Sequence, residues 1–183
     1  NASVTIAGWT TDADNFVMVV VPEAESHRGK LKDTVSGYYR GFTLNPSTSV
    51  DVFTSSQSYT RTIGLAVDGD GSFLSDNIVL GGTDNILDKA LSADPYGIGI
   101  FAGLNSKVIN SISYGAHNGG NGAGIAFDFP VAGALSYNNT AYGNDRGITN
   151  YSSGNNVIVK NTLSASNTGA DFYSGLNTMT ISY

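Results

Sequence analysis

The segment Asp68-Gly69-Asp70-Gly71-Ser72 resembles the beginning of a calcium-binding loop. Calcium takes about six to eight oxygen ligands, which closely spaced carboxylates in a glycine-rich turn can supply. Asp76 could add a third carboxylate, although Val79 stands where an EF-hand has its bidentate glutamate. The alternative is a simple turn that favours aspartate and glycine for their backbone conformations. The sequence therefore offers Asp68, Asp70 and Asp76 as a calcium candidate and no other cofactor.

A second pair of carboxylates occurs in Asp12-Ala13-Asp14-Asn15, just after Trp9. Two acids at this spacing could form an acid–base pair or bind calcium. They are also the residues that accept hydrogen bonds from nearby backbone N–H groups in a turn. The turn is the favoured interpretation.

The C-terminal half offers little for catalysis. Its acids Asp128, Asp145 and Asp171 stand at different places relative to the surrounding strand-like segments. His117 lies in a glycine-rich stretch, and a lone histidine in a loop is weak evidence for a general base. No Ser-His-Asp pattern and no phosphate-binding glycine loop accompany it. We therefore expect no catalytic residues and a protein that is not an enzyme.

The composition narrows the class of protein further. The chain has 183 residues, a formal net charge of −6, nine lysines and arginines, and no cysteine. Disulfides and thiolate metal sites are thereby excluded, and a nucleic-acid partner is not expected because no basic face is evident. The one basic cluster, residues 27–32, is flanked by acids and is expected to be a solvated loop; a site for an acidic partner is the alternative. The sequence contains no apolar run of about 20 residues, so no membrane-spanning helix is expected. Because the chain begins at Asn1 without methionine, we expect a processed protein or a piece of a larger one.

Short strand-like segments separated by Gly, Asn, Asp and Ser fill the sequence, which contains 23 glycines. This pattern predicts an all-β protein. Only residues 86–91 hint at a helical turn. We expect a single domain over residues 1–183, irregular over 1–95 and regularly repeated over 96–183.

Two phrases repeat in the C-terminal half. One is a glycine- or alanine-led strand at residues 97–101, 124–127, 147–151 and 170–173, at spacings of 23 to 27 residues. The other occupies residues 108–115, 134–143 and 157–166, and aligns Asn110-Ser111, Asn139-Thr140 and Asn161-Thr162. Repeats of this length with short strands and polar turns indicate a solenoid, in which each coil buries its apolar side against its neighbours.

The repeated asparagines predict a structural element. An asparagine that points inward at the same corner of successive coils can bond to the next asparagine and to the turn backbone, which satisfies groups that would otherwise be buried unpaired. We therefore predict a ladder formed by Asn110, Asn139 and Asn161.

The Asn-Ser/Thr-apolar phrase after a short strand resembles the repeat of right-handed parallel β-helix proteins, which include pectate lyases, alginate-modifying enzymes and phage tailspikes. The opening phrase at residues 5–15, the later segment 59–65 and the closing 169–175 are similar to β-helix proteins of tailed phages and environmental bacteria. The resemblance implies a right-handed parallel β-helix, here of about seven or eight coils, and a surface or virion structural role.

The expected function follows from this resemblance and from the missing catalytic pattern. It is a non-enzymatic structural or assembly protein on a virion or cell surface, such as a decoration, spike or filament subunit with glycan-binding capacity. The alternative is a polysaccharide lyase or glycoside hydrolase of the β-helix type. Expected partners are further copies of the chain, other virion or surface proteins, and a polysaccharide. The two ends of such a solenoid expose strand edges, so another chain or domain is expected to cover them.

Overall fold

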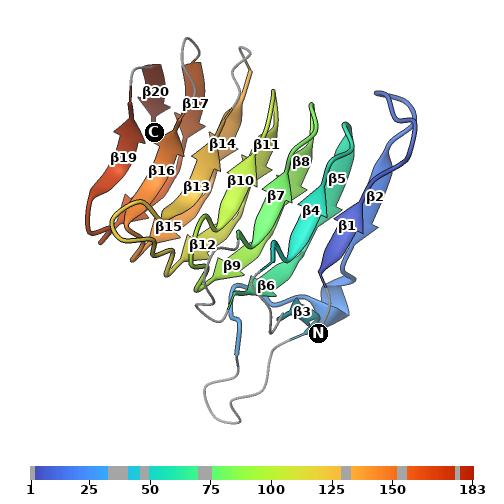
Figure 1. Ribbon diagram of the computed structural model, residues 1–183, viewed down its shortest axis with the longest axis horizontal. Coiled ribbons are helices and arrows are strands. Elements are labelled where there is room, and N and C mark those ends of the chain that lie inside the picture. Colours follow the sequence, from blue (N-terminus) through green and yellow to red (C-terminus); the bar gives the residue numbers. More distant parts are fainter. Residues whose placement is uncertain are drawn as a thin grey trace.

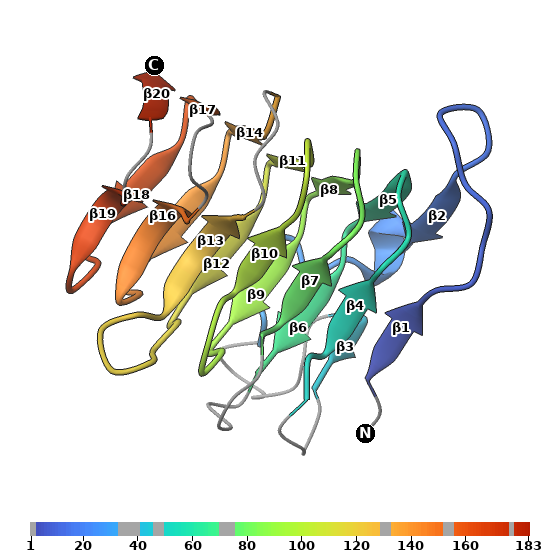
Figure 2. The same cartoon turned by 45° about the horizontal axis from the view of Figure 1, so that its top comes forward.

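A computed structural model of the chain describes residues 3–32, 41–45, 50–69, 76–128, 133–151, 156–175 and 178–183. These residues form a right-handed parallel β-helix, in which the chain winds repeatedly through three parallel sheets (Figures 1 and 2). The one helix within the described ranges is a 3-10 turn, η1 (Glu23–Glu25). The predicted all-β class and the parallel β-helix are confirmed.

Each coil contributes one strand to each sheet in turn. The first sheet contains β1 (Val4–Ile6), β4 (Phe53–Ser55), β7 (Ile78–Leu80), β10 (Ile100–Ala102), β13 (Ala123–Phe127), β16 (Arg146–Asn150) and β19 (Ala170–Ser174). The second contains β2 (Val17–Val20), β5 (Thr60–Ile63), β8 (Ile86–Asp88), β11 (Lys107–Ile109), β14 (Leu135–Tyr137), β17 (Asn156–Lys160) and β20 (Thr178–Ser182). The third contains β3 (Thr43–Leu44), β6 (Ala66–Asp68), β9 (Leu91–Ala93), β12 (Ile112–Tyr114), β15 (Thr140–Tyr142) and β18 (Leu163–Ala165). Six coils therefore pass through all three sheets within the described residues, slightly fewer than the seven or eight predicted.

The repeat found in the sequence corresponds to the register of the first sheet. Ile100 pairs with Ile125, which pairs with Ile148, which pairs with Phe172. The sequence alignment therefore needs two corrections. Gly99-Ile100, and not the pair that begins at residue 97, corresponds to Gly124-Ile125. In the last coil, the alignment is shifted by one residue, because Phe172 corresponds to Ile148. These inward side chains stack in a column, and the three isoleucines are fully buried. Such columns form the core that no single coil could bury alone.

Sharp corners explain the many asparagines, aspartates and glycines. From the second coil onward, the residue at the corner between the second and third sheets has a positive φ, and so do residues in two further rows. The row between the second and third sheets is Gly64, Lys89, Asn110, Asn138 and Asn161. Asparagine and glycine adopt this conformation at the lowest cost, so these turns select them. The helical turn suggested at residues 86–91 is wrong: Lys89 is one of these corners, with strands on either side.

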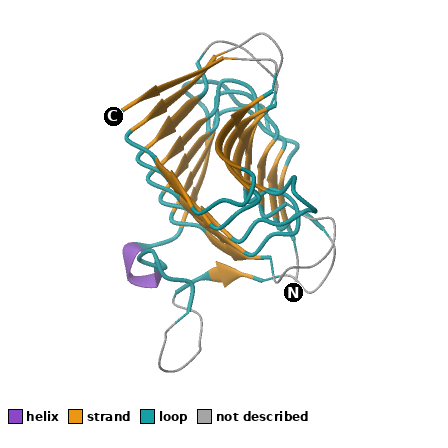
Figure 3. Ribbon diagram, turned by 90° about the vertical axis from the view of Figure 1, so that its left-hand side faces the viewer, coloured by secondary structure: helices purple, strands orange, loops and turns teal. Residues whose placement is uncertain are grey.

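An N-terminal segment covers part of the third sheet from outside. Residues 21–32, here called the strap, include η1, which lies outside the three sheets in the view along the rod (Figure 3). Leu31 of the strap packs with Ala66, Leu91 and Ala93 in a second buried cluster. The Lys32 ammonium lies 3.3 Å from the Asp68 carboxylate, beside the same strands. The strap therefore ties the first coil to later ones.

Candidate interaction surface

The asparagine row exists, but on the outside of the corner. Asn161 donates its amide N–H to Asn138 Oδ1 at 2.7 Å, Asn138 donates to Asn110 Oδ1 at 3.1 Å, and Asn110 donates to the Asp88 carboxylate at 2.8 Å. Asn110 and Asn161 are thus brought together through Asn138 and not through Asn139. The three asparagines are exposed, whereas the predicted ladder pointed inward.

Asn139 lies one residue further along, where the side chain turns inward. Its Oδ1 accepts the Ser111 backbone N–H at 2.8 Å, and its amide donates to Val108 O and Ser136 Oγ, both at 2.8 Å. Asn139 is 1% exposed, so its side chain satisfies buried polar groups of its own coil and of the preceding one.

Replacing Asn139 with leucine should lower the free energy of unfolding by about 1–3 kcal/mol, because buried backbone groups lose their partners. Asn138→Gly is the matched control: it keeps the positive φ and removes only exposed hydrogen bonds, so a change below about 1 kcal/mol is expected. Urea unfolding of both variants measures the difference. Equal losses would contradict the inward role of Asn139.

The calcium candidate is not assembled within the described part of the chain. Asp70 lies outside the described residues, and Asp68 faces Lys32. The Asp76 carboxylate accepts the Ile98 backbone N–H at 2.7 Å, and burial raises the pKa of Asp76 to about 6. No group of three or more potential metal-ligating His, Cys, Asp or Glu side chains occurs among the described residues.

Asp12 has a structural role in its turn. Its Oδ1 accepts the backbone N–H groups of Asp14 at 2.9 Å and Asn15 at 2.7 Å. The side-chain amide of Asn15 and these backbone bonds lower the pKa of Asp12. The Asp12 side chain thus closes a turn by accepting the N–H groups of the residues that follow it, as predicted for this segment.

Asp145 organises the glycine-rich loop that contains His117. Its Oδ2 accepts the backbone N–H groups of Asn118 at 2.7 Å, Gly120 at 2.9 Å and Gly122 at 3.0 Å, and its Oδ1 lies 3.2 Å from His117 Nδ1. Burial raises the pKa of Asp145, but these hydrogen bonds outweigh it and hold the pKa at about 2.

The three acids considered for catalysis remain apart along the first sheet. Asp145 precedes β16, whereas Asp128 follows β13. Because β13 and β16 are parallel neighbours, these two acids lie at opposite ends of the pair. Asp171 lies in β19, where its carboxylate accepts the Asn167 amide at 2.7 Å. No carboxylate pair is formed from these three.

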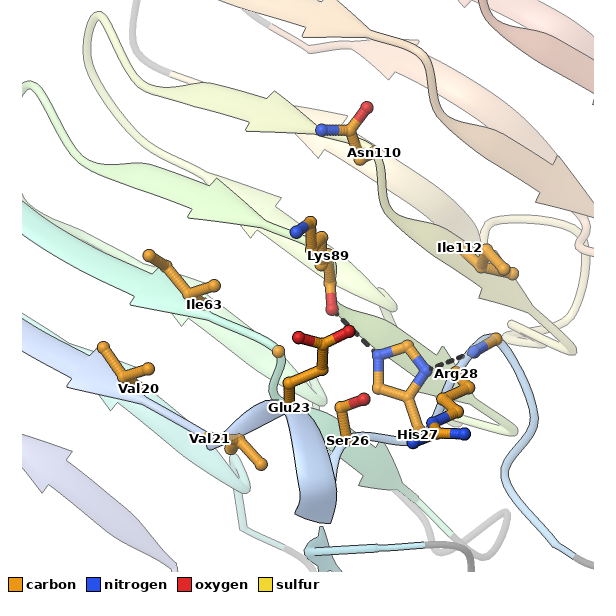
Figure 4. Close-up of a pocket in the computed structure, with 12 residues that line it drawn as sticks. Val20, Val21, Glu23, Ser26, His27, Arg28, Ile63, Lys89, Asn110 and Ile112 are labelled. Carbon is orange, nitrogen blue, oxygen red and sulfur yellow. Dashed lines mark hydrogen bonds between the residues drawn. The ribbon is translucent and has the colours of Figure 1, made fainter.

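A groove of about 440 Å³ opens between the strap and the corners of the second sheet (Figure 4). Its walls combine apolar residues with polar groups from four segments of the chain. It is lined by Val20, Val21, Glu23, Ser26, His27, Arg28, Gly29, Ile63, Gly64, Lys89, Asn110 and Ile112. The groove is therefore shared between the strap and three later coils.

His27 holds the strap in place at this groove. Its Nδ1 accepts the Gly29 backbone N–H at 2.8 Å, so Nε2 carries the proton and donates to Lys89 O at 2.8 Å. His27 is 6% exposed, and burial lowers its pKa although the bond to Lys89 opposes this. Residues 27–32 are therefore not wholly a solvated loop, because His27 and Leu31 are buried. The signal for this was Leu31, an apolar residue between two lysines.

Lowering the pH should release the strap. The folded pKa of His27 lies below its ordinary value of 6.5, so the unfolded chain binds more protons. The free energy of unfolding should therefore fall as the pH drops below about 6.5 and level off below the folded pKa. Urea unfolding of wild type and His27→Gln across this range gives the test. The same slope in both proteins would show that His27 is not its source.

The outer face of the second sheet carries both apolar and charged side chains. Outward residues alternate with inward ones along each strand, and neighbouring strands align them in rows. Met18 is 52% exposed, Val20 50% and Tyr137 39%. The apolar residues of these rows are Met18, Val20, Ile63, Ile86, Ile109, Leu135, Tyr137 and Ile158. Charged residues on the same rows divide these apolar residues into smaller groups: Arg61, Asp88, Lys107 and Lys160. The largest group is formed by Ile109, Leu135, Tyr137 and Ile158 on three neighbouring strands. A group of outward apolar residues is a candidate interaction site.

Comparisons with known proteins gave no match, whether to protein-family models, to curated proteins or to solved structures. The parallel β-helix rests on the geometry described above. Among the described residues, no helix is long and apolar enough to cross a membrane.

Proposed function

We propose that this chain is a non-enzymatic structural protein of a virion or cell surface, which associates through the outer face of the second sheet. The observation that carries the proposal is the group of four outward apolar residues on β11, β14 and β17, which are Ile109, Leu135, Tyr137 and Ile158. Ile109, Leu135 and Ile158 are half-buried and Tyr137 is exposed, so a partner could bury the apolar area that remains in contact with water. A second copy of the chain is the partner proposed, in agreement with the resemblance to phage surface β-helix proteins.

The association can be tested with a charge placed in the centre of this face. Wild type should form oligomers in sedimentation and light-scattering measurements, and Ile109→Lys or Leu135→Lys should weaken the association at least tenfold. Thr54→Lys is the matched control, because it adds the same charge on the outer face of the first sheet. A wild type whose association is unchanged by both central lysines would refute the proposal.

A polysaccharide-degrading enzyme is the second candidate, and one group of contacts favours it. The exposed His117 is oriented by Asp145, and on neighbouring coils Arg146 lies 4.1 Å from the centre of the Tyr173 ring. The Tyr151 hydroxyl donates to Asn121 O at 3.2 Å beside them. A histidine, an arginine and tyrosine rings are suited to an acidic sugar.

A screen against acidic and neutral polysaccharides separates the two functions. The structural proposal expects neither unsaturated uronates nor new reducing ends. Release of either product by wild type, and its loss in His117→Ala, would establish the enzyme instead.

A further inference from the structure

Two opposite charges flank the apolar group on the outer face of the second sheet. One outward row runs over four neighbouring strands, through Asp88 on β8, Ile109 on β11, Tyr137 on β14 and Lys160 on β17 (Figure 1). Asp88 is therefore one strand away from Ile109 on one side, and Lys160 is one strand away from Tyr137 on the other. The row consists of an acid, two apolar residues and a base, in that order.

Asp88 and Lys160 do not neutralise each other within one chain. They lie three strands apart, which is about 14 Å at the strand spacing of a sheet. The Asp88 carboxylate accepts the Asn110 amide at 2.8 Å, and this donor is neutral. Within the described part of the chain, neither Asp88 nor Lys160 forms an ion pair. Both charges are thus available to a partner of complementary charge.

A partner must approach these strands from their outer face. Each of β8, β11, β14 and β17 is hydrogen-bonded to a neighbouring strand on both sides, so no further strand can be added beside them. Two sheets that pack face to face lie about 10 Å apart, with their strands nearly aligned. A second copy can therefore place its own second sheet over the first.

One symmetric arrangement matches the order of residues in this row. A two-fold axis parallel to the strands, midway between β11 and β14, reverses the order of the strands and keeps their direction. It places β11 over the partner's β14, and β8 over the partner's β17. Ile109 then faces the partner's Tyr137, and Asp88 faces the partner's Lys160. The symmetry makes each of these contacts occur twice.

The second outward row agrees with the same axis. Ile86 on β8 then faces the partner's Ile158 on β17. Leu135 faces the partner's Lys107, whose methylene stem can cover it while the ammonium group stays in water.

Neighbouring positions of the axis do not give this complementarity. An axis placed on β14 would set Ile109 against the partner's Lys160. An axis placed on β11 would set Lys107 against the partner's Lys107. Of these three positions, only the one midway between β11 and β14 joins opposite charges.

We propose that two copies pack their second sheets in this way, with antiparallel rods, and form a dimer whose register is set by two Asp88–Lys160 ion pairs. The inference rests on the proposed association through the second sheet, and it adds the number of copies, their orientation and the residues that fix it. The contact uses the same surface on both copies, so it is closed and stops at two. Charge pairs of this kind determine register and partner choice more than affinity.

Reversing one charge at a time tests the register. Asp88→Lys sets two lysines against each other at both ion pairs, and Lys160→Asp sets two aspartates against each other. Each variant alone should associate about tenfold more weakly than wild type, or worse. An equal mixture of the two variants should recover most of the lost affinity, because opposite charges then meet at both positions.

A variant of equal net charge is the matched control. Lys107→Asp changes the charge as much as Lys160→Asp does, but residue 107 faces the partner's Leu135 in this arrangement. Its mixture with Asp88→Lys should recover no affinity. Asp88→Asn keeps an acceptor for the Asn110 amide and should weaken the association less than Asp88→Lys. Circular dichroism verifies that every variant is folded.

Sedimentation equilibrium at low salt separates the possible outcomes. Wild type should reach a plateau at twice the mass of one chain. If Ile109→Lys disrupts the association but the two charge variants do not weaken it, or their mixture does not restore it, the arrangement is overturned while the proposed surface stands. Growth of wild type beyond two copies through this face would overturn it as well. A monomeric wild type, or association unaffected by Ile109→Lys, would refute the proposed surface and the arrangement together.

Discussion

Replacing Asp145 with alanine should lower the free energy of unfolding by about 2–4 kcal/mol, since hydrogen bonds to a charged acceptor are each worth more than neutral ones. Asp145 is 7% exposed and accepts three backbone N–H groups from residues 118–122. Alanine leaves these donors without an acceptor at the beginning of β13. Denaturant unfolding measures the loss.

Asparagine is the matched replacement for Asp145. Asp145→Asn keeps one acceptor oxygen but loses the charge, so its effect should lie between wild type and Asp145→Ala. The pH dependence gives a second readout. The folded pKa of about 2 lies below the ordinary 3.8, so this stabilisation is present above about pH 4 and is lost as the pH falls toward 2. Identical acid unfolding of wild type and Asp145→Asn would contradict this role.

Replacing Ile125 with alanine should have the other large effect, a loss of about 2–5 kcal/mol. Ile125 is fully buried and stacks between Ile100 and Ile148 in the central column of the first sheet. Coils on both sides are held by their own backbone bonds and cannot collapse into the space, so a cavity remains.

Graded substitutions test this explanation. Ile125→Val should cost only about 0.5–1.5 kcal/mol, because it removes a single methyl group. Thr54→Ala, at an outward half-buried position of the same sheet, should change stability by less than about 1 kcal/mol. A similar loss for Ile125→Ala and Thr54→Ala would show that the column is not the main support of the coil.

The repeat was visible in the sequence because each column needs an apolar residue in every coil. That requirement spaces Ile100, Ile125 and Ile148 almost regularly, and the spacing predicts the solenoid before any contact is known. The number of coils does not follow from this spacing, because the N-terminal strands are separated by longer and more variable segments.

The asparagine register could not be resolved in the same way. Asn138 and Asn139 are adjacent, and either one fits an alignment with Asn110 and Asn161. A shift of one residue reverses the direction of the side chain, so the choice decides between an exposed row and a buried bridge. Only the strand pairing, in which Tyr137 lies beside Ile109, settles it.

The position of the strap could not be predicted, because it depends on contacts between residues that are far apart in the sequence. Leu31 is buried by Leu91, and His27 bonds to Lys89, both about 60 residues away. Local composition, with lysines on either side of Leu31, indicated a solvated loop. The apolar group on the outer face of the second sheet could not be predicted for a related reason, since each of its isoleucines also fits a buried strand.

The strap also divides the rod into two parts of unequal cooperativity. In a solenoid each coil contacts only its neighbours, so local opening begins at the ends and spreads one coil at a time. The strap bypasses this order, because Lys32 bonds at β6, His27 bonds at Lys89 and Gly29 lies against Ile112. Among the described residues, the coils from β15 onward make no such link to the strap, so they should open more readily than the coils that the strap holds. Hydrogen exchange in unassembled protein should therefore be fastest there and slow toward β6 to β12, a gradient that the loss of His27 would flatten.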